Sequence, residues 1–260
     1  MYEQLVTVAP SEVSCRNELK LRPLLNYLQD VAGDAAARFE GAPRQMAAHG
    51  YAWVLTKYEL DFIGSPPVMD SVFRVRTWHC ATESYNTLRV FQAETPEGEP
   101  LLWGKTAWLL LDLVTGRPVK PVAHLPKSFI EAGRPIEPDF RKVPDLGTLE
   151  NLGDGPVSES VFSVRFHDLD SNGHVNNAVY FEWVYEATPL DLMLHEIVGC
   201  SAVFRTGALF GDSVRVLAKE HPNDDGLREF VYEIRSVKNN KKNSGKPLAS
   251  FSAFWRRFAS

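Results

Sequence analysis

Cysteine is scarce in this chain: Cys15, Cys80 and Cys200 are the three cysteines among 260 residues. They lie far apart and are odd in number, so they match neither a disulfide framework nor the spacing of metal-ligand pairs. We therefore expect three structural thiols in a reducing cytoplasm, with no metal and no cofactor.

Long apolar runs and an excess of basic charge are absent too. No apolar stretch approaches the roughly 20 residues that a membrane-spanning helix needs. The first five residues, Met1-Tyr2-Glu3-Gln4-Leu5, lack the basic start and apolar core of a signal peptide. The net charge is −5, whereas a general nucleic-acid-binding protein is usually basic. With 44% hydrophobic residues, the chain predicts a globular cytoplasmic protein that binds neither membrane nor nucleic acid.

The first half of the chain predicts one long helix among strands. Residues 19–39 carry apolar side chains at helical spacing, and Pro23 suits the first turn of a helix. Strands are predicted at 2–8, 53–62, 71–79, 86–94 and 101–113.

The second half repeats this plan. A helix is predicted at 176–194, which kinks, or ends and restarts, at Pro189. Strands are predicted at 162–166, 202–206, 213–219, 228–237 and 248–258. The segment 70–75 is echoed by 212–216, which indicates a two-copy repeat. Such a repeat favours an antiparallel sheet around one long helix, made twice.

Between the two copies, residues 118–156 have a different texture. Prolines recur there and apolar periodicity fades, apart from one short predicted helix around 128–132. So long a connection is unusual inside one compact domain, so it predicts a surface linker. The predicted organisation is a first domain at 1–117, a linker at 118–156 and a second domain at 157–260.

The run from Asp168 to Tyr180 concentrates carboxylates, carboxamides and one imidazole. If residues 170–174 are extended, the side chains of Asp170, Asn172 and His174 share one face. A helix starting just beyond them offers free N–H groups and the positive end of its dipole. An acid or base, amide donors and such a helix end can together attack an acyl carbonyl. The alternative is a core histidine followed by an ordinary asparagine helix cap.

This run, Asp-Leu-Asp-x-Asn-x-His-Val-Asn-Asn-x-x-Tyr, resembles the acyl-acyl carrier protein (ACP) thioesterases. The resemblance extends to Trp53-Val54-Leu55, Thr77-Trp78 and Phe210-Gly211-Asp212. It implies an α+β fold of two tandem hotdog domains, each an antiparallel sheet wrapped around a long central helix.

The resemblance also implies the roles of individual residues. It assigns catalysis to Asp170, Asn172 and His174. It places the acyl chain in the N-terminal domain. The residues expected to bind substrate are Leu28, Trp53, Asn176 and Asn177.

One departure from the family pattern falls on the strand after the second helix. The family has an acidic residue there, next to a position that is Cys in some members. Aligned from Phe210-Gly211-Asp212, these positions are Gly207 and Ala208, which can neither titrate nor act as nucleophiles. Attack by water, activated by His174 or Asp170, or an Asp170 anhydride are the routes left.

The implied activity is hydrolysis of fatty acyl-ACP with release of free fatty acid. Alternatives are an acyl-CoA thioesterase of the same fold, or a silent acyl-binding protein that lacks the family's acidic residue. The acidic carrier with its phosphopantetheine-linked acyl chain needs a basic docking patch, although 238–246 also fits a plain solvated loop. Patch candidates are Arg44, Lys238, Lys241, Lys242, Lys246, Arg256 and Arg257. Two hotdogs in one chain mimic a single-hotdog dimer, so both a monomer and a homodimer fit.

Overall fold

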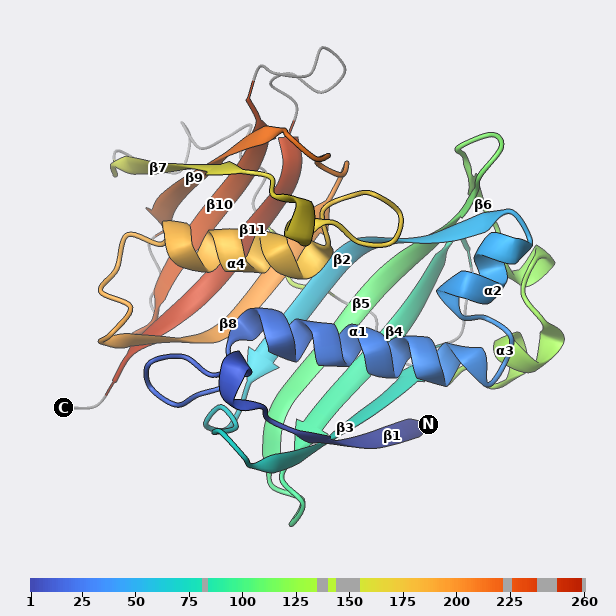
Figure 1. Cartoon of the computed structure of the whole chain (residues 1–260), viewed down its shortest axis with the longest axis horizontal. Helices are drawn as coiled ribbons and strands as arrows, with labels where there is room; N and C mark the ends of the chain where they lie inside the picture. Colours follow the sequence, from blue (N-terminus) through green and yellow to red (C-terminus); the bar gives the residue numbers. More distant parts are fainter. Residues whose placement is uncertain (81–83, 135–139, 144–154, 222–225, 238–246, 259–260) are drawn as a thin grey trace. The chain divides into compact units, whose positions relative to one another are not determined.

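The computed structural model describes residues 1–80, 84–134, 140–143, 155–221, 226–237 and 247–258. The chain forms two compact units, Met1–Phe140 and Arg141–Ser260. Each unit holds an antiparallel sheet with one long helix against it (Figure 1), which confirms the predicted two-copy plan and its α+β class. Among the described residues, no helix has both the length and the apolar character needed to cross a membrane.

The first unit contains five main strands in the order β1-β3-β4-β5-β2, with β6 paired to β5. Its strands are β1 (Tyr2–Thr7), β2 (Tyr51–Phe62), β3 (Val72–His79), β4 (Asn86–Glu94), β5 (Pro100–Asp112) and β6 (Pro118–Val119). Its helices are η1 (Pro10–Glu12), α1 (Leu21–Ala37), α2 (Pro43–Ala48), η2 (Pro121–Ala123) and α3 (Lys127–Glu131).

Helix α1 forms because its apolar residues recur at helical spacing along one side. Leu24, Leu28, Val31 and Ala35 are all buried on that side, and α1 packs against β1 and β3. Burial of these side chains holds the helix against the sheet, as the sequence predicted.

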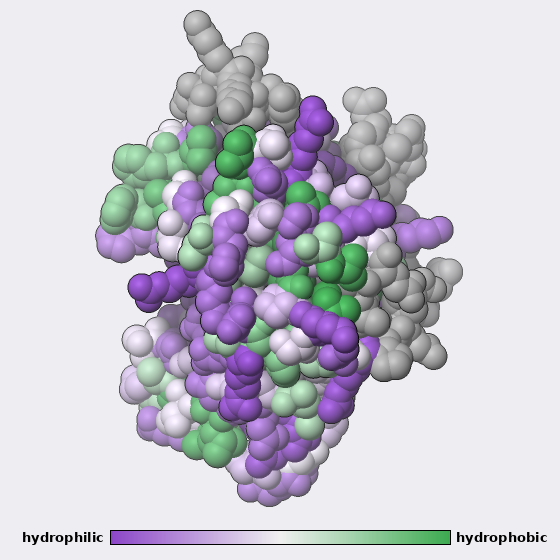
Figure 2. All heavy atoms as spheres, turned by 90° about the vertical axis from the view of Figure 1, so that its right-hand side faces the viewer, coloured by the Kyte–Doolittle hydropathy of each residue, from purple (hydrophilic) through white to green (hydrophobic). Residues whose placement is uncertain are grey.

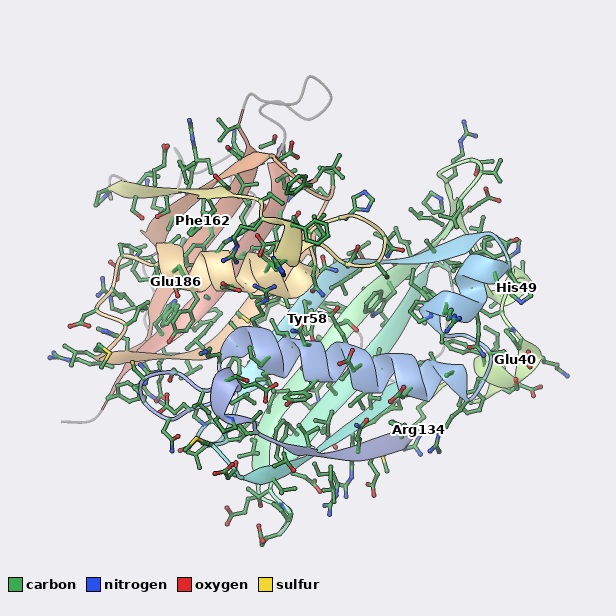
Figure 3. The ribbon with its side chains drawn as sticks, viewed as in Figure 1. Glu40, His49, Tyr58, Arg134, Phe162 and Glu186 are labelled. Atoms are coloured by element: carbon green, nitrogen blue, oxygen red, sulfur yellow. The ribbon has the colours of Figure 1, made fainter. Side chains whose placement is uncertain are left out.

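The second unit has its strands in the order β8-β11-β10-β9-β7. Its strands are β7 (Val157–Ser163), β8 (His195–Phe204), β9 (Ser213–His221), β10 (Arg228–Ser236) and β11 (Pro247–Arg257), and its helices are η4 (Phe166–Asp168) and α4 (Asn177–Ala187). Helix α4 packs against β7 and β9, where Phe162 of β7 (labelled in Figure 3) stacks on Trp183 of α4 with ring centroids 6.0 Å apart.

The predicted helix at 176–194 is too long by almost two turns. Helix α4 ends at Ala187, and Thr188 is already extended. A residue before proline avoids the helical conformation, and Pro189 has no N–H to continue the helix, so the chain leaves the helix there. Strand β8 consequently begins at His195, well before the predicted start at 202.

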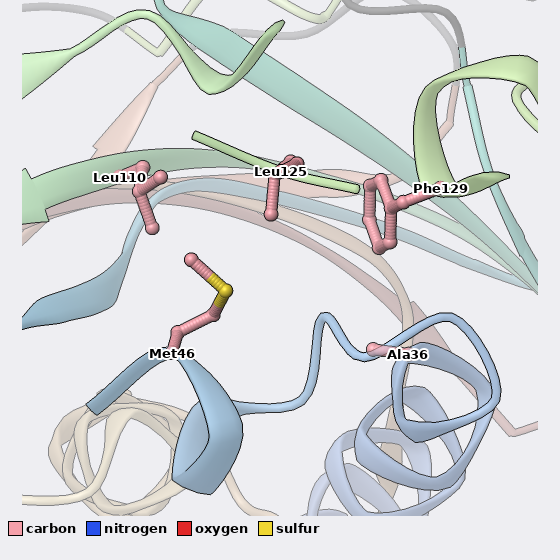
Figure 4. Close-up of a cluster of buried hydrophobic side chains, with 5 residues drawn as sticks. All are labelled: Ala36, Met46, Leu110, Leu125 and Phe129. Carbon is pink, nitrogen blue, oxygen red and sulfur yellow. The ribbon is translucent and has the colours of Figure 1, made fainter. Parts of the chain in front are cut away.

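The first part of the predicted linker belongs structurally to the first unit. Strand β6 pairs with β5, and α3 carries Phe129 into a buried cluster with Ala36, Met46, Leu110 and Leu125 (Figure 4). The division between the units, after Phe140, falls inside the predicted linker. Residues 135–139 and 144–154 of that linker lie outside the described part of the chain.

The surface is mixed in hydropathy, as the composition predicts. On the face shown in Figure 2, hydrophobic side chains form separate patches among hydrophilic ones. Cys80 and Cys200 are buried, and Cys15 is exposed.

Candidate active site

The residues from Asp170 to His174 form a tight turn, so the prediction of an extended segment is wrong. The Asp170 N–H donates to the His174 carbonyl (2.7 Å), and Gly173 adopts a left-handed φ of 75°. Oδ1 of Asp170 accepts the backbone N–H groups of Asn172 (2.8 Å) and His174 (3.2 Å). The competing force is this local side-chain-to-backbone bonding, which favours a turn over a strand. The turn still brings Asp170, Asn172 and His174 together, and the side chains of Asn172 and His174 are exposed.

Asp168 holds this turn to the preceding segment. Its side chain is fully buried, and Oδ2 accepts the backbone N–H of Arg165 (2.8 Å). Nη2 of Arg165 pairs with Oδ1 of Asp168 (2.8 Å), and the Asp168 carbonyl accepts the N–H of Asn176 (2.8 Å). Asp168 therefore has a structural role, since it binds the chain on both sides of the turn, at Arg165 and at Asn176.

Helix α4 begins directly after the motif, as predicted. Asn176 is its N-cap, and Oδ1 of Asn176 accepts the N–H of Ala178 (2.9 Å). The N–H of Asn177, the first residue of α4, has no hydrogen-bond partner within the part of the chain that the structure describes. That N–H, at the positive end of the helix dipole, can stabilise a developing negative charge.

The segment 207–209 lies beside the turn. The N–H of Val175 donates to the Ala208 carbonyl (3.0 Å), and His174 forms a β-bridge with Leu209. A Cβ added at Gly207 would lie 2.8 Å from Cδ2 of His174. Gly207 and Ala208, at the positions where the resemblance led us to expect an acidic residue and its neighbour, are therefore part of the backbone beside His174.

Tyr180 fixes that backbone from the side of α4. Its hydroxyl accepts the N–H of Ala208 (2.9 Å), which is fully buried. Burial is the main reason why the pKa of the Tyr180 phenol is raised to about 12; the Ala208 N–H opposes this rise, and the charges of Asp212 and Asp170 add to it. The phenol is therefore neutral at ordinary pH, so its role is to hold Ala208. Sequence reasoning left Tyr180 unassigned, although its place in the motif could have indicated it.

The first unit contains a loop with most of the same backbone hydrogen bonds. The Ser14 N–H donates to the Glu18 carbonyl (2.8 Å), and Asn17 has a left-handed φ of 64°. Glu18 bridges Val68 just as His174 bridges Leu209. The equivalent pairs, first unit before second, are Glu12 and Asp168, Ser14 and Asp170, Arg16 and Asn172, Asn17 and Gly173, Glu18 and His174, and Lys20 and Asn176.

The two loops differ in the chemistry of their side chains. In the first unit Oγ of Ser14 accepts the Arg16 N–H (3.2 Å), and Nε of Arg16 pairs with Oε2 of Glu18 (2.8 Å). The carboxylate, carboxamide and imidazole of the second loop are thus replaced by a hydroxyl and an ion pair. The backbone of this loop can therefore form without Asp, Asn and His at these positions.

Comparison of the two loops also shows that the predicted alignment of segment 70–75 with segment 212–216 is wrong by one residue. The N–H of Val8 donates to the Ser71 carbonyl, and that of Val164 donates to the Asp212 carbonyl. Ser71, and not Asp70, is therefore the equivalent of Asp212. By the same count Pro67 corresponds to Ala208, and it has no N–H for an acceptor such as Tyr180 to bind.

The residues predicted to line the acyl chain lie in the first unit. Leu28 is fully buried on α1. Trp53 donates from Nε1 to the Gly41 carbonyl (2.9 Å) and stacks on Phe129 at 6.3 Å. Trp53 thus has a structural role in the cluster of Figure 4, and its role toward substrate remains a prediction.

The predicted basic patch is only partly described. Arg44 is exposed on α2, and Nη2 of Arg256 pairs with Glu196 at 2.8 Å. Arg257 is exposed at the end of β11, whereas Lys238, Lys241, Lys242 and Lys246 lie outside the described residues. Across the described residues, no group of three His, Cys, Asp or Glu side chains could hold a metal ion.

Two family models match this chain. The acyl-ACP thioesterase N-terminal domain matches residues 1–125, and the acyl-ACP thioesterase C-terminal domain matches residues 154–256. The second match contains the turn, the start of α4 and Gly207.

Known proteins and solved structures agree with these matches. A palmitoyl-acyl carrier protein thioesterase of Gossypium hirsutum is 24% identical over 79% of this chain and 51% of its own length. The chain thus spans about half the length of the first curated relatives it matches. A Lactobacillus plantarum structure designated an oleoyl thioesterase has a TM-score of 0.85 at 20% identity, covering 100% of this chain and 97% of the other. A 12:0-ACP thioesterase from Umbellularia californica has a TM-score of 0.78 at 17% identity, covering 99% and 94%. These similarities confirm the predicted fold of two tandem hotdog domains.

Proposed function

Because this chain belongs to the acyl-ACP thioesterase family, we propose that it hydrolyses the thioester of fatty acyl-ACP and releases free fatty acid. The duplicated loop is the observation that carries this proposal. The same backbone is built twice, and Asp170, Asn172 and His174 occur in one copy alone. Since the loop folds without them, these three side chains are retained for chemistry in the second unit.

The roles follow from the contacts. Oδ1 of Asp170 is used by two backbone N–H groups, so Asp170 is best suited to hold the turn and orient His174. His174, which is exposed and whose imidazole packs against the backbone of Gly207, is the better base for water. Asn172 positions the water or the carbonyl. The Asn177 N–H stabilises the oxyanion, and loss of one such donor typically raises a barrier by about 3 kcal/mol.

The proposed reaction has two stages, addition of water and collapse of the intermediate. The water oxygen forms a bond to the thioester carbon while His174 takes one proton of the water. The tetrahedral intermediate then collapses, the carbon–sulfur bond breaks, and His174 returns the proton to the departing thiolate. The products are a free fatty acid and the carrier thiol, and no second carboxylate or cysteine is required at Gly207 or Ala208.

A loop exchange tests this assignment with an internal reference. The variant Asp170→Ser/Asn172→Arg/His174→Glu gives the second loop the side chains of the first, which are known from residues 14–18 to suit this backbone. We expect it to keep its fold by circular dichroism and to lose at least 100-fold in hydrolysis of dodecanoyl-ACP. Hydrolysis at the wild-type rate would exclude these residues from catalysis.

The matched control makes the reverse exchange in the first loop. Ser14→Asp/Arg16→Asn/Glu18→His should leave hydrolysis within about twofold of the wild type, because that loop lies outside the proposed site. Single replacements of Asp170, Asn172 and His174 by Ala then show how much of the lost hydrolysis each side chain accounts for. Comparing dodecanoyl-ACP with dodecanoyl-CoA decides between a carrier-specific enzyme and an acyl-CoA thioesterase.

A silent acyl-binding protein is the second candidate, and the absence of an acidic side chain at Gly207 and Ala208 favours it. Tight binding of acyl-ACP without release of fatty acid would support that candidate. A reducing cytoplasm also remains part of the proposal, since the three cysteines are few and lie far apart in the sequence.

A further inference from the structure

Two phenylalanine rings lie exposed next to the proposed site. Phe166 is 70% exposed and Phe210 is 63% exposed, and their ring centroids are 6.2 Å apart in an edge-to-face arrangement. Of the aromatic side chains that the structure describes, no others are more than half exposed. Exposed apolar side chains that touch one another mark an interaction site more often than scattered single ones.

The position of this aromatic pair is set by the elements of the site. Phe210 follows Leu209, which bridges His174, and the Gly211 N–H after it donates to the Val164 carbonyl (3.4 Å). Phe166 begins η4, whose Asp168 fixes the catalytic turn. A group bound at the aromatic pair therefore contacts the two segments that hold and flank the proposed catalytic turn.

The first unit shows that the fold does not need these rings. The residues equivalent to Phe166 and Phe210 are Pro10 and Met69; the bonds of Gly211 to Val164 and of Asp212 to Leu209 recur there as those of Asp70 to Val8 and of Ser71 to Val68. Exposed phenyl rings bury little apolar surface within the chain itself, so they contribute little to its stability. The two rings occur in the second unit alone, as do the proposed catalytic side chains. This difference between the units indicates that the rings serve in binding.

The exposure of the rings restricts what they bind. A long alkyl chain needs a surface that shields it from water on all sides, and two rings that are mostly exposed cannot provide this. The arm that joins a thioester to its carrier is half polar: it carries amide groups, a gem-dimethyl group and a terminal phosphodiester. Its apolar segments gain from contact with aromatic faces while its amides stay in water.

Polar side chains next to the aromatic pair could bind the phosphodiester end of the same arm. Phe166 lies in the chain between Arg165 and His167, and both of these side chains are exposed. Arg165 pairs with Asp168 and Glu182, yet its side chain keeps 59% of its surface accessible. Its charge is balanced by these two carboxylates, so Arg165 offers exposed N–H donors, and not net charge, to the phosphodiester of the arm.

We infer that Phe166 and Phe210 dock the phosphopantetheine arm of the acyl carrier protein. This inference rests on the proposed function, since it assumes that the substrate is a thioester on that arm. The pair holds the arm while the thioester lies at His174. It contributes to substrate binding and not to the chemical step.

The test separates docking from hydrolysis. A carrier protein that bears a dodecyl thioether on its phosphopantetheine cannot be hydrolysed, so its Kd measures docking alone. In Phe166→Ser/Phe210→Ser we expect this Kd to rise about tenfold, whereas Val161→Ser, an exposed apolar residue of β7, should leave it unchanged. An equal Kd in the wild type and the double variant, or no binding by the wild type, overturns the inference. If the double variant fails to fold, Phe166→Pro/Phe210→Met takes the residues of the first unit and provides the same comparison.

Steady-state kinetics then show whether the double variant is impaired in substrate binding or in the chemical step. For dodecanoyl-ACP and dodecanoyl-CoA, the KM of the double variant should rise about tenfold while kcat stays within about twofold. Hydrolysis of the dodecanoyl thioester of 2-mercaptoethanol, which lacks the arm, should not change. A loss confined to the coenzyme A substrate contradicts the choice of the carrier as the source of the arm. A wild type that binds the thioether carrier but hydrolyses no thioester refutes the proposed function and leaves the docking result standing.

Discussion

The imidazole of His174 fills the space that a side chain at Gly207 would take. A Cβ at residue 207 would lie 2.8 Å from Cδ2 of His174 and 3.3 Å from its Cβ and Cγ. A side chain at residue 207 would therefore have to displace the imidazole, whereas glycine leaves it in place. Gly207 and His174 form one unit, in which the backbone of the first supports the ring of the second.

Replacement of Gly207 by alanine should displace His174. The backbone of Gly207 is not in the left-handed region, so alanine fits its conformation and the collision with the ring is the whole effect. We expect kcat for dodecanoyl-ACP to fall 10- to 100-fold with little change in thermal stability, because a small misplacement of a catalytic group costs about 100-fold.

The control for this variant is Gly33→Ala on α1. No atom lies within 4 Å of the added Cβ at residue 33, so the activity should be unchanged. Alanine in a helix interior should raise the free energy of unfolding by about 0.5–1 kcal/mol. A fully active Gly207→Ala variant would show that His174 does not need its observed position.

Loss of the Tyr180 hydroxyl should destabilise the second unit. In Tyr180→Phe the N–H of Ala208 loses its acceptor in a fully buried place, and an unsatisfied buried donor costs about 1–3 kcal/mol. Urea unfolding measures this loss. Tyr185→Phe on the same helix removes a hydroxyl from a partly buried ring and should change stability by less than about 0.5 kcal/mol. Equal effects of the two variants would contradict the role of Tyr180.

Truncation of Phe129 should show that α3 is part of the first unit. Phe129 is 2% exposed among Ala36, Met46, Leu110 and Leu125, so Phe129→Ala should lower the free energy of unfolding by about 3–5 kcal/mol. Val122→Ala, at a half-exposed position of the same segment, should cost less than about 0.5 kcal/mol. A negligible effect of Phe129→Ala would fit a linker that merely connects the units.

His79 should make the stability of the first unit depend on pH. Burial is the main reason why the pKa of His79 falls from its ordinary 6.5 to about 4; the Phe129 carbonyl opposes this fall, and the positive charges of Arg89 and the N-terminus add to it. The unfolded chain therefore binds a proton at a higher pH than the folded chain does. Stability is complete above pH 6.5 and is lost as the pH falls toward 4, by up to about 3 kcal/mol.

Unfolding in urea at pH 7 and at pH 5 checks this dependence. His79→Asn should remove most of the difference between the two pH values, whereas His124→Asn, at an exposed ring, should retain it. A titration of the His79 ring by NMR with a midpoint near 6.5 would falsify the depressed pKa.

The sequence predicted the repeated plan of strands around a helix because apolar periodicity and turn residues act locally. It also identified the motif from Asp168 to Tyr180, since residue identities and their spacing are properties of the chain itself. The family assignment followed from that spacing.

Only the tertiary structure decided how the motif folds and what surrounds it. The Asp170 carboxylate binds two backbone N–H groups and bends 170–174 into a turn, which an alternating pattern cannot reveal. The contacts of His174 with Gly207 and of Tyr180 with Ala208 join residues from separate elements, as does the burial of Phe129. Local patterns determine which elements form, but side-chain packing and buried hydrogen bonds between distant segments determine where each residue lies.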